Sequence, residues 1–147
     1  QVLTEVEPDL PMLEADVEQM DQVLVNLLSN AGKFAPDGST VGLAVRRDEA
    51  RLGRPGVLIS VRDTGPGIPA EHCEKVFDRY FRVPGQSPST GTGIGLSIVR
   101  EIVKRHGGHV WVDSPEGLGA QFSLVLPVSQ KSAGVGDVPG DNREATS

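Results

Sequence analysis

An apolar stripe at helical spacing is the feature that most constrains how this 147-residue chain can fold. Between Asp16 and about Phe34, apolar residues recur at the three- and four-residue intervals of a helix face, and they are Met20, Val23, Leu24, Leu27, Leu28 and Ala31. The run Pro36-Asp37-Gly38 then stops the pattern. The stripe predicts one long helix that buries this face against a second layer of the molecule.

The remaining segments predict strands and a second strong helix. Apolar residues at helical spacing run from Ile94 to His106 and end at Gly107-Gly108, which are good capping residues. A shorter helix is expected over Glu71 to Phe77. Strand patterns cover Val2 to Glu7, Val41 to Arg47, Val57 to Arg62, His109 to Asp113 and Ala120 to Leu126. The length suits one compact domain, and we expect it to span residues 1–128.

Composition excludes several classes of protein. With a net charge of -6 and a pI of about 5.0, the chain is a poor candidate for a non-specific nucleic-acid binder, so any anionic ligand needs a local site. The single cysteine, Cys73, cannot form an internal disulfide and is expected to be a small, semi-buried apolar residue in a reducing cytosol. Residues 129–147 are small, polar and rich in Gly and Pro, and we expect a disordered tail there.

Three polar side chains share one face of the first predicted helix. Asn26, Asn30 and Lys33 stand at i, i+4 and i+7, so at about 100° per residue they lie within roughly 60° of one another and about 120° from the apolar stripe. An amide oxygen can ligate Mg²⁺, which also takes phosphate oxygens as ligands, and a lysine can contact an anion. The alternative interpretation is a solvated polar face with an incidental pair of asparagines.

Two glycine-rich runs adjoin regular elements. An apolar strand ends in the run Asp63-Thr64-Gly65-Pro66-Gly67-Ile68. One interpretation is an ordinary turn. In the other, the carboxylate accepts a hydrogen bond from an exocyclic amine, and the glycines let the backbone approach a flat ligand. Gly91-Thr92-Gly93-Ile94-Gly95-Leu96 opens the second helix, where free N–H groups and the helix dipole favour an anion. A flexible hinge is the alternative there, and the spacing matches neither a Walker loop nor a Rossmann motif.

A cluster of aromatic and arginine residues, Phe77-Asp-Arg-Tyr-Phe-Arg82, precedes a long loop. Arg82 could reach a transferring phosphoryl group, or the cluster could be simple packing beside a solvated charge pair. The loop has no apolar periodicity, so we expect a mobile lid over Val83 to Thr92. The histidines share no spacing and are predicted to be surface or helix-end residues: His72, His106 and His109.

The order of these four groups resembles that of the catalytic and ATP-binding domain of bacterial sensor histidine kinases. Asn26 to Phe34 resembles the N box, Asp63 to Gly67 the G1 box, Phe77 to Arg82 the F box and Gly91 to Leu96 the G2 box. The resemblance covers about residues 1–128. It implies the Bergerat fold of the GHKL superfamily, an α/β two-layer sandwich in which about three helices cover one face of a mixed sheet and ATP lies in the helical layer under a mobile lid.

The resemblance also implies roles for single residues. Asn30 corresponds to the Mg²⁺ ligand, with Asn26 beside it, and Arg82 to the residue that approaches the γ-phosphate; Arg82 and Asn26 are the candidate catalytic residues. The implied ATP contacts are Asn26, Asn30, Lys33 and Phe34 in the N box, Asp63, Gly65, Gly67 and Ile68 at the adenine, and Gly91, Thr92, Gly93, Ile94, Gly95 and Leu96 at the phosphates.

Three departures from the family pattern bear on activity. Hydrolysing relatives, such as gyrase and the heat-shock chaperones, carry a Glu where this chain has Asn26, whose amide cannot act as general base for water. The family usually places a Thr before the residue that corresponds to Phe122, where its hydroxyl supports the adenine Asp; Gln121 stands there and is expected to do so less well. No histidine here has the phospho-acceptor pattern, so the acceptor is expected on a preceding domain.

The implied function is that of an ATP-dependent protein-histidine kinase. Such a domain binds Mg²⁺ and ATP and transfers the γ-phosphoryl to a histidine on the dimerisation domain of the same kinase, with a response regulator downstream. The alternative is a nucleotide-sensing module that changes partner contacts without transfer. We expect the isolated chain to be monomeric, to bind no nucleic acid and to be cytoplasmic, whether or not its parent is anchored in the membrane.

Overall fold

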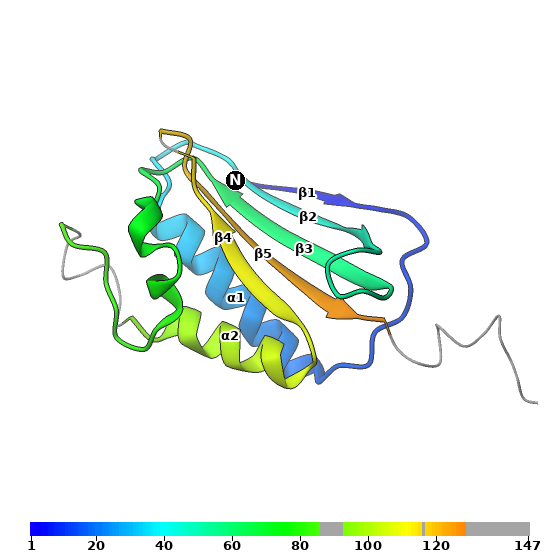
Figure 1. Cartoon of the computed structure of the whole chain (residues 1–147). Coiled ribbons are helices and arrows are strands. Elements are labelled where there is room, and N and C mark those ends of the chain that lie inside the picture. The colour runs from blue at the N-terminus through cyan, green and yellow to red at the C-terminus, as the bar shows by residue number, and fades with distance from the viewer. Residues whose placement is uncertain (86–92, 116, 129–147) are drawn as a thin grey trace, which may run out of the picture.

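The computed structural model describes residues 1–85, 93–115 and 117–128. Five strands form one sheet in the order β1–β2–β3–β5–β4. Their bounds are Val2–Val6 for β1, Val41–Asp48 for β2, Gly56–Asp63 for β3, His109–Asp113 for β4 and Ala120–Pro127 for β5. β1 pairs with β2 in parallel, and the other neighbours are antiparallel. The helices α1 (Val17–Phe34) and α2 (Gly95–Arg105) lie on one face of this mixed sheet (Figure 1), which confirms the expected two-layer α/β sandwich.

Both ends of α1 follow from the sequence. Asp16 is the N-cap, and its carboxylate accepts hydrogen bonds from the backbone N–H groups of Glu18 at 3.0 Å and Gln19 at 3.2 Å. These donors have no partner within the helix, so a side-chain acceptor at the N-cap stabilises the first turn. At the other end Ala35 is extended, as a residue that precedes a proline usually is. The predicted helix is therefore confirmed to within a residue.

The two helices pack their apolar stripes against the same face of the sheet. The members of the apolar core cluster that are at most 3% exposed come from α1, from α2 and from the inner faces of β3 and β5: Val23, Leu27, Ala31, Val99, Ile102, Val103, Val61, Phe122, Leu124 and Leu126. Apart from Phe122, Val, Leu, Ile and Ala supply this list, as the low aromatic content of 4% requires. Burial of these side chains fixes how α1 and α2 lie over the sheet.

Turns of 3₁₀ helix replace the single short helix expected over Glu71 to Phe77. The segment forms η1 (Ala70–His72) and η2 (Lys75–Phe77), and the second of these buries Val76 and Phe77. A helix of seven residues gains little from its own hydrogen bonds because nucleation is costly. Tertiary contacts determine the conformation of this segment instead. The Phe77 ring packs edge-on against Phe122, with ring centroids 6.1 Å apart.

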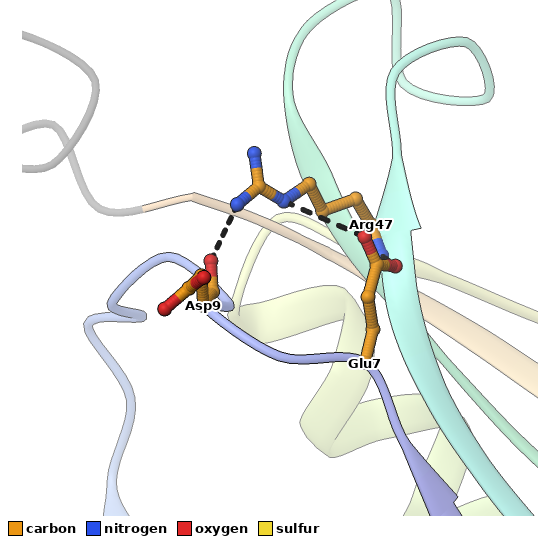
Figure 2. A network of polar contacts seen from close by, with 3 residues as sticks. All are labelled: Glu7, Asp9 and Arg47. Atoms are coloured by element: carbon orange, nitrogen blue, oxygen red, sulfur yellow. Dashed lines mark hydrogen bonds and ion pairs between the residues drawn. The ribbon is translucent and has the colours of Figure 1, made fainter.

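A polar cluster fixes the exit of the chain from β1 (Figure 2). The backbone N–H of Arg47 donates to Glu7 Oε1 at 2.9 Å, and its guanidinium contacts Glu7 Oε2 at 3.8 Å and the carbonyl oxygen of Asp9. Asp9 has a positive φ of 58°, a conformation that Asp adopts more readily than most residues. The cluster holds the turn with which the chain leaves the sheet edge and crosses to α1.

His106 joins the end of α2 to the start of α1. Its Nδ1 lies 2.8 Å from the carbonyl oxygen of Ile102, and its Nε2 accepts from the backbone N–H of Asp16 at 3.1 Å. We expect His106→Ala to lower the free energy of unfolding by about 1 kcal/mol, because the hydrogen bond between the helices is lost. Denaturant unfolding measures this change. Lys104→Ala in the same helix is the control and should have little effect; equal stability of His106→Ala and the wild type would contradict the prediction.

Cys73 is partly buried and packs against the core, in agreement with the expectation from its sequence context. Burial raises the pKa of the Cys73 thiol, and the carboxylates of Asp113 and Glu74 raise it further. The reactive thiolate is therefore scarce at neutral pH. Within the described part of the chain, neither helix has the length and apolar character needed to cross a membrane.

Candidate functional site

A cavity of about 370 Å³ lies between the helical layer and one end of the sheet. Its volume falls within the range of small-molecule and cofactor sites. Most of the residues singled out from the sequence line it, although they come from four separate segments: Asn26, Asn30, Lys33, Phe34, Asp63, Gly67, Ile68, Arg82, Gly93, Ile94, Gly95 and Leu96. The fold thus brings the four boxes together around one space.

The α1 wall of the cavity carries the predicted polar face. Asn26, Asn30 and Lys33 all line it, as their helical spacing requires. Asn26 also donates from Nδ2 to the carbonyl oxygen of Gly95 at 3.4 Å, so it links α1 to the first residue of α2. Ser29 lies on the same wall and was missed, although its position three residues after Asn26 could have revealed it.

Asp63 supplies a negative charge at one end of the cavity. It is the last residue of β3, and with 3% exposure it is a buried carboxylate. Its Oδ1 accepts from the backbone N–H of Gly65 at 2.8 Å. Among the residues that the structure describes, no Lys or Arg lies within ion-pair distance of this carboxylate. An acceptor that is buried without a cation suits a ligand that brings its own hydrogen-bond donor.

Two glycines of the G1 box have different tasks. Gly67 lines the cavity with a φ of +84°, a backbone conformation that glycine adopts without steric cost. Gly65 does not line it; a Cβ there would collide with the carbonyl group of Phe34 at the end of α1. Gly65 therefore permits the close approach of the loop to α1, whereas Gly67 shapes the wall.

The expectation that Gln121 supports the carboxylate of Asp63 is wrong. Ala120 and Phe122 line the cavity, and Ala120 pairs in register with Asp63. Gln121 lies on the opposite face of the sheet, beside Arg62. Successive side chains of a strand point to opposite faces, so the residue directly before Phe122 cannot reach Asp63. The nearest residue on the cavity side is an alanine, which has no hydroxyl to offer.

The N-terminus of α2 opens into the same cavity. Its N-cap, Ile94, makes no side-chain capping hydrogen bond, and Ile94, Gly95 and Leu96 line the cavity wall. The first N–H groups of a helix have no acceptor within the helix and carry its positive dipole end. This end of the cavity is therefore suited to bind an anion.

The F box and the G2 box meet directly. The backbone N–H of Tyr80 donates to the carbonyl oxygen of Gly93 at 2.7 Å, and a Cβ on Gly93 would lie only 2.9 Å from the Tyr80 Cα. Tyr80 itself has a positive φ of 69°, which is a strained conformation for a bulky residue. Arg82, two residues further on, lines the cavity. The junction holds Tyr80, two residues before Arg82, against the segment that leads into α2.

The histidines occupy three different environments. His106 bonds at the end of α2 and His109 is exposed, as expected. The ring of His72 does not fit a surface interpretation: its side chain is 15% exposed, and it packs against Phe81 with centroids 5.4 Å apart. Phe81 in turn lines the cavity. No sequence pattern linked His72 to Phe81, because their separation in the sequence does not match the repeat of a helix or a strand.

Some predicted elements lie outside the described residues. These are Gly91 and Thr92 of the G2 box, most of the expected lid from Val83 to Thr92, and the expected tail at 129–147. Sequence reasoning also missed apolar cavity residues that come from η2, the F box and the residue after it, α2 and β5. They are Val76, Phe81, Val83, Ile98, Ala120 and Phe122, together with Pro66 of the G1 box.

Comparison with known proteins agrees with this geometry. Residues 15–130 match the family described as histidine kinase-, DNA gyrase B- and HSP90-like ATPases. The chain belongs to this ATPase family. Among solved members, the mycobacterial sensor histidine kinase MprB is 30% identical, with a TM-score of 0.76 over 87% of this chain and 83% of that one. Full-length ShkA, solved in complex with AMPPNP, is also 30% identical with a TM-score of 0.72, covering 88% of this chain and 26% of that chain.

Curated members of the ATPase family include longer sensory kinases. The adaptive-response sensory kinase SasA of Nostoc sp. strain PCC 7120 is 41% identical over 127 residues, which are 86% of this chain and 31% of that protein. SasA of Prochlorococcus marinus strain MIT 9313 is 43% identical over 133 residues, 90% of this chain and 35% of that protein. The chain therefore spans about a third of the length of these relatives, and its likeness is to the histidine kinase branch of the ATPase family.

Proposed function

We propose that this domain binds ATP with Mg²⁺ and transfers the γ-phosphoryl group to a histidine on the dimerisation domain of its parent kinase. The observation that carries the proposal is the pairing of two features in one cavity. At one end is the buried carboxylate of Asp63, and at another is the uncapped N-terminus of α2. The first suits the amine of adenine, and the second suits phosphate groups.

The polar residues of α1 extend the phosphate end. Lys33 adds a positive charge to the wall, and Asn30 adds an amide oxygen. Mg²⁺ prefers oxygen ligands and usually keeps waters and substrate phosphates in its shell rather than requiring a full set of protein ligands. No group of three or more His, Cys, Asp or Glu that could hold a metal occurs in the described ranges. One amide oxygen beside bound phosphates fits this shared mode of coordination, in which Mg²⁺ offsets phosphate charge.

Asn26 favours transfer over hydrolysis. It lies on the wall between Asn30 and the first turn of α2, where its amide donates to Gly95. An amide cannot accept a proton from water near neutral pH, so this position offers no general base. We expect the nucleophile to be the ring nitrogen of a histidine, which bonds to the γ-phosphorus as the bridging P–O bond breaks and ADP leaves.

The decisive experiment supplies the acceptor separately. The isolated domain is mixed with γ-labelled ATP and the dimerisation domain of its parent, and label on the acceptor histidine is measured. Transfer supports the kinase, whereas nucleotide binding without transfer favours a nucleotide-sensing module. We further propose that the domain works in the cytoplasm and that the phosphorylated kinase passes its phosphoryl group to a response regulator.

If Asn30 is a Mg²⁺ ligand, its removal should lower ATP affinity only when Mg²⁺ is present. Asn30→Ala should weaken ATP binding about tenfold when Mg²⁺ is present, because an amide ligand is removed, and should have little effect in a chelator. Calorimetry in the two conditions measures the difference. Gln22→Ala, which removes an exposed amide of α1 that does not line the cavity, is the matched control and should change ATP binding in neither condition. Equal losses with and without Mg²⁺ would indicate a defect in the fold and not a lost ligand.

A further inference from the structure

Ser114 lies where three strand ends meet beside the cavity. It follows the last residue of β4 directly and does not itself line the cavity. At the same end of the sheet, β3 finishes at Asp63 and β5 begins at Ala120, and these two residues pair in register. A side chain at this place can contact both the G1 box and the connection from β4 to β5.

The hydroxyl of Ser114 makes both contacts. The backbone N–H of Ile68 donates to Ser114 Oγ at 2.7 Å, and the hydroxyl donates to the carbonyl oxygen of Gly119 at 2.6 Å. A hydroxyl has one proton and two lone pairs. The first bond uses a lone pair and the second uses the proton, so the two bonds do not compete. Ser114 thus ties a residue of the cavity wall to the start of β5.

The G1 box is held at two points. At its start, the Gly65 N–H bonds to Asp63 Oδ1 at 2.8 Å; at its end, the Ile68 N–H bonds to Ser114. Between them, Gly67 approaches Ser114 so closely that a Cβ would lie 2.9 Å from its Oγ. Of the two holding groups, only the Asp63 carboxylate belongs to the motif that the sequence singled out. The second point of support comes from a different strand.

We propose that Ser114 is a positioning residue for the base of the nucleotide. It fixes the backbone from Pro66 to Ile68, which forms the cavity wall next to Asp63. The inference rests on the proposed function, in which adenine lies against that carboxylate. Because the bonds of Ser114 reach the G1 box and the β4–β5 connection and not the phosphate end, its loss weakens ADP and ATP binding by the same factor.

The test compares four variants with the wild type. Ser114→Ala removes the hydroxyl, Ser114→Thr keeps it, and Ser114→Cys keeps a weaker donor and acceptor. Ser39→Ala is the matched control, because its hydroxyl also bonds a backbone carbonyl, that of Pro36 at 2.6 Å, in a turn that does not line the cavity. Calorimetry gives the affinities for ADP and ATP, and amide exchange of Ile68 is followed without nucleotide.

The expected result has three parts. In Ser114→Ala the Ile68 amide exchanges faster with solvent, and the affinities for ADP and ATP both fall about tenfold, by the same factor for the two nucleotides. Ser114→Thr restores both properties, and Ser39→Ala changes neither. Ser114→Cys shows a smaller loss of affinity, again equal for ADP and ATP. This variant provides the test if Ser114→Ala does not fold.

Two kinds of failure are distinguishable. A wild-type chain that binds neither ADP nor ATP overturns the proposed function itself. With a wild type that binds, unchanged affinities in Ser114→Ala overturn the role of Ser114 alone, even if the Ile68 amide exchanges faster. A loss confined to ATP also overturns it, because that result would assign Ser114 to the phosphate end.

Discussion

Replacing Asp63 by Asn should weaken ATP binding by about 2 to 4 kcal/mol, a factor between about 30 and 1,000 in the dissociation constant. Asn keeps an oxygen that can accept from the Gly65 N–H, so the turn after β3 survives. The other oxygen becomes an NH₂ group, which turns an acceptor into a donor opposite the adenine amine. Binding is lost because two donors then face each other in a buried place.

Asp48→Asn is the matched control for this change. Asp48 ends β2 as Asp63 ends β3, and its carboxylate also accepts a backbone N–H within its own turn, that of Arg51 at 2.9 Å. It does not line the cavity. Calorimetry should show normal ATP affinity for Asp48→Asn. An unchanged affinity in a folded Asp63→Asn domain would refute the assignment of the adenine end.

Replacing Arg82 by Ala should reduce phosphoryl transfer to the acceptor histidine by roughly 100-fold or more, by analogy with other transition-state donors. In a loose transition state, negative charge spreads over the transferring phosphoryl group and the bridging oxygen. A guanidinium near these atoms stabilises the transition state more than bound ATP. ATP affinity should therefore fall much less than the rate, and single-turnover transfer together with calorimetry separates the two.

Arg79→Ala is the control for the arginine. Arg79 belongs to the same F box, but its guanidinium lies 5.9 Å from the Tyr80 ring centroid and it does not line the cavity. Its transfer rate should stay close to that of the wild type. A normal rate in Arg82→Ala, or rapid ATP hydrolysis by the isolated domain, would show that the chemistry is assigned to the wrong residue.

Local patterns were sufficient for the two α-helices. The stripes of α1 and α2 and the stop signals at Pro36 and Gly107 gave bounds that agree with the structure within about two residues. The shared face of Asn26, Asn30 and Lys33 followed from helical geometry alone and is the α1 wall of the cavity. These predictions succeeded because each depends on residues that are close in the sequence.

The remaining errors come from contacts between distant segments. The turn after Ala70 is decided by the packing of Phe77 on Phe122, and a short window of sequence does not contain that information. No sequence pattern indicated a role for Ser114, because its hydrogen-bond partners are Ile68, in another segment of the chain, and Gly119. The error at Gln121 was avoidable: strand alternation with Phe122 already places its side chain on the opposite face.

The pairing of β3 with β5 sets the order in which the site is completed during synthesis. β2 and β3 form a hairpin from neighbouring residues, but Asp63 meets its partner Ala120 only after β5 has been made, and β5 is the last described strand of the sheet. A nascent chain on the ribosome therefore exposes the G1 box long before the cavity exists. Because β5 supplies Ala120 and Phe122 to the cavity lining, a nascent domain lacks that wall of the site until β5 has left the ribosome.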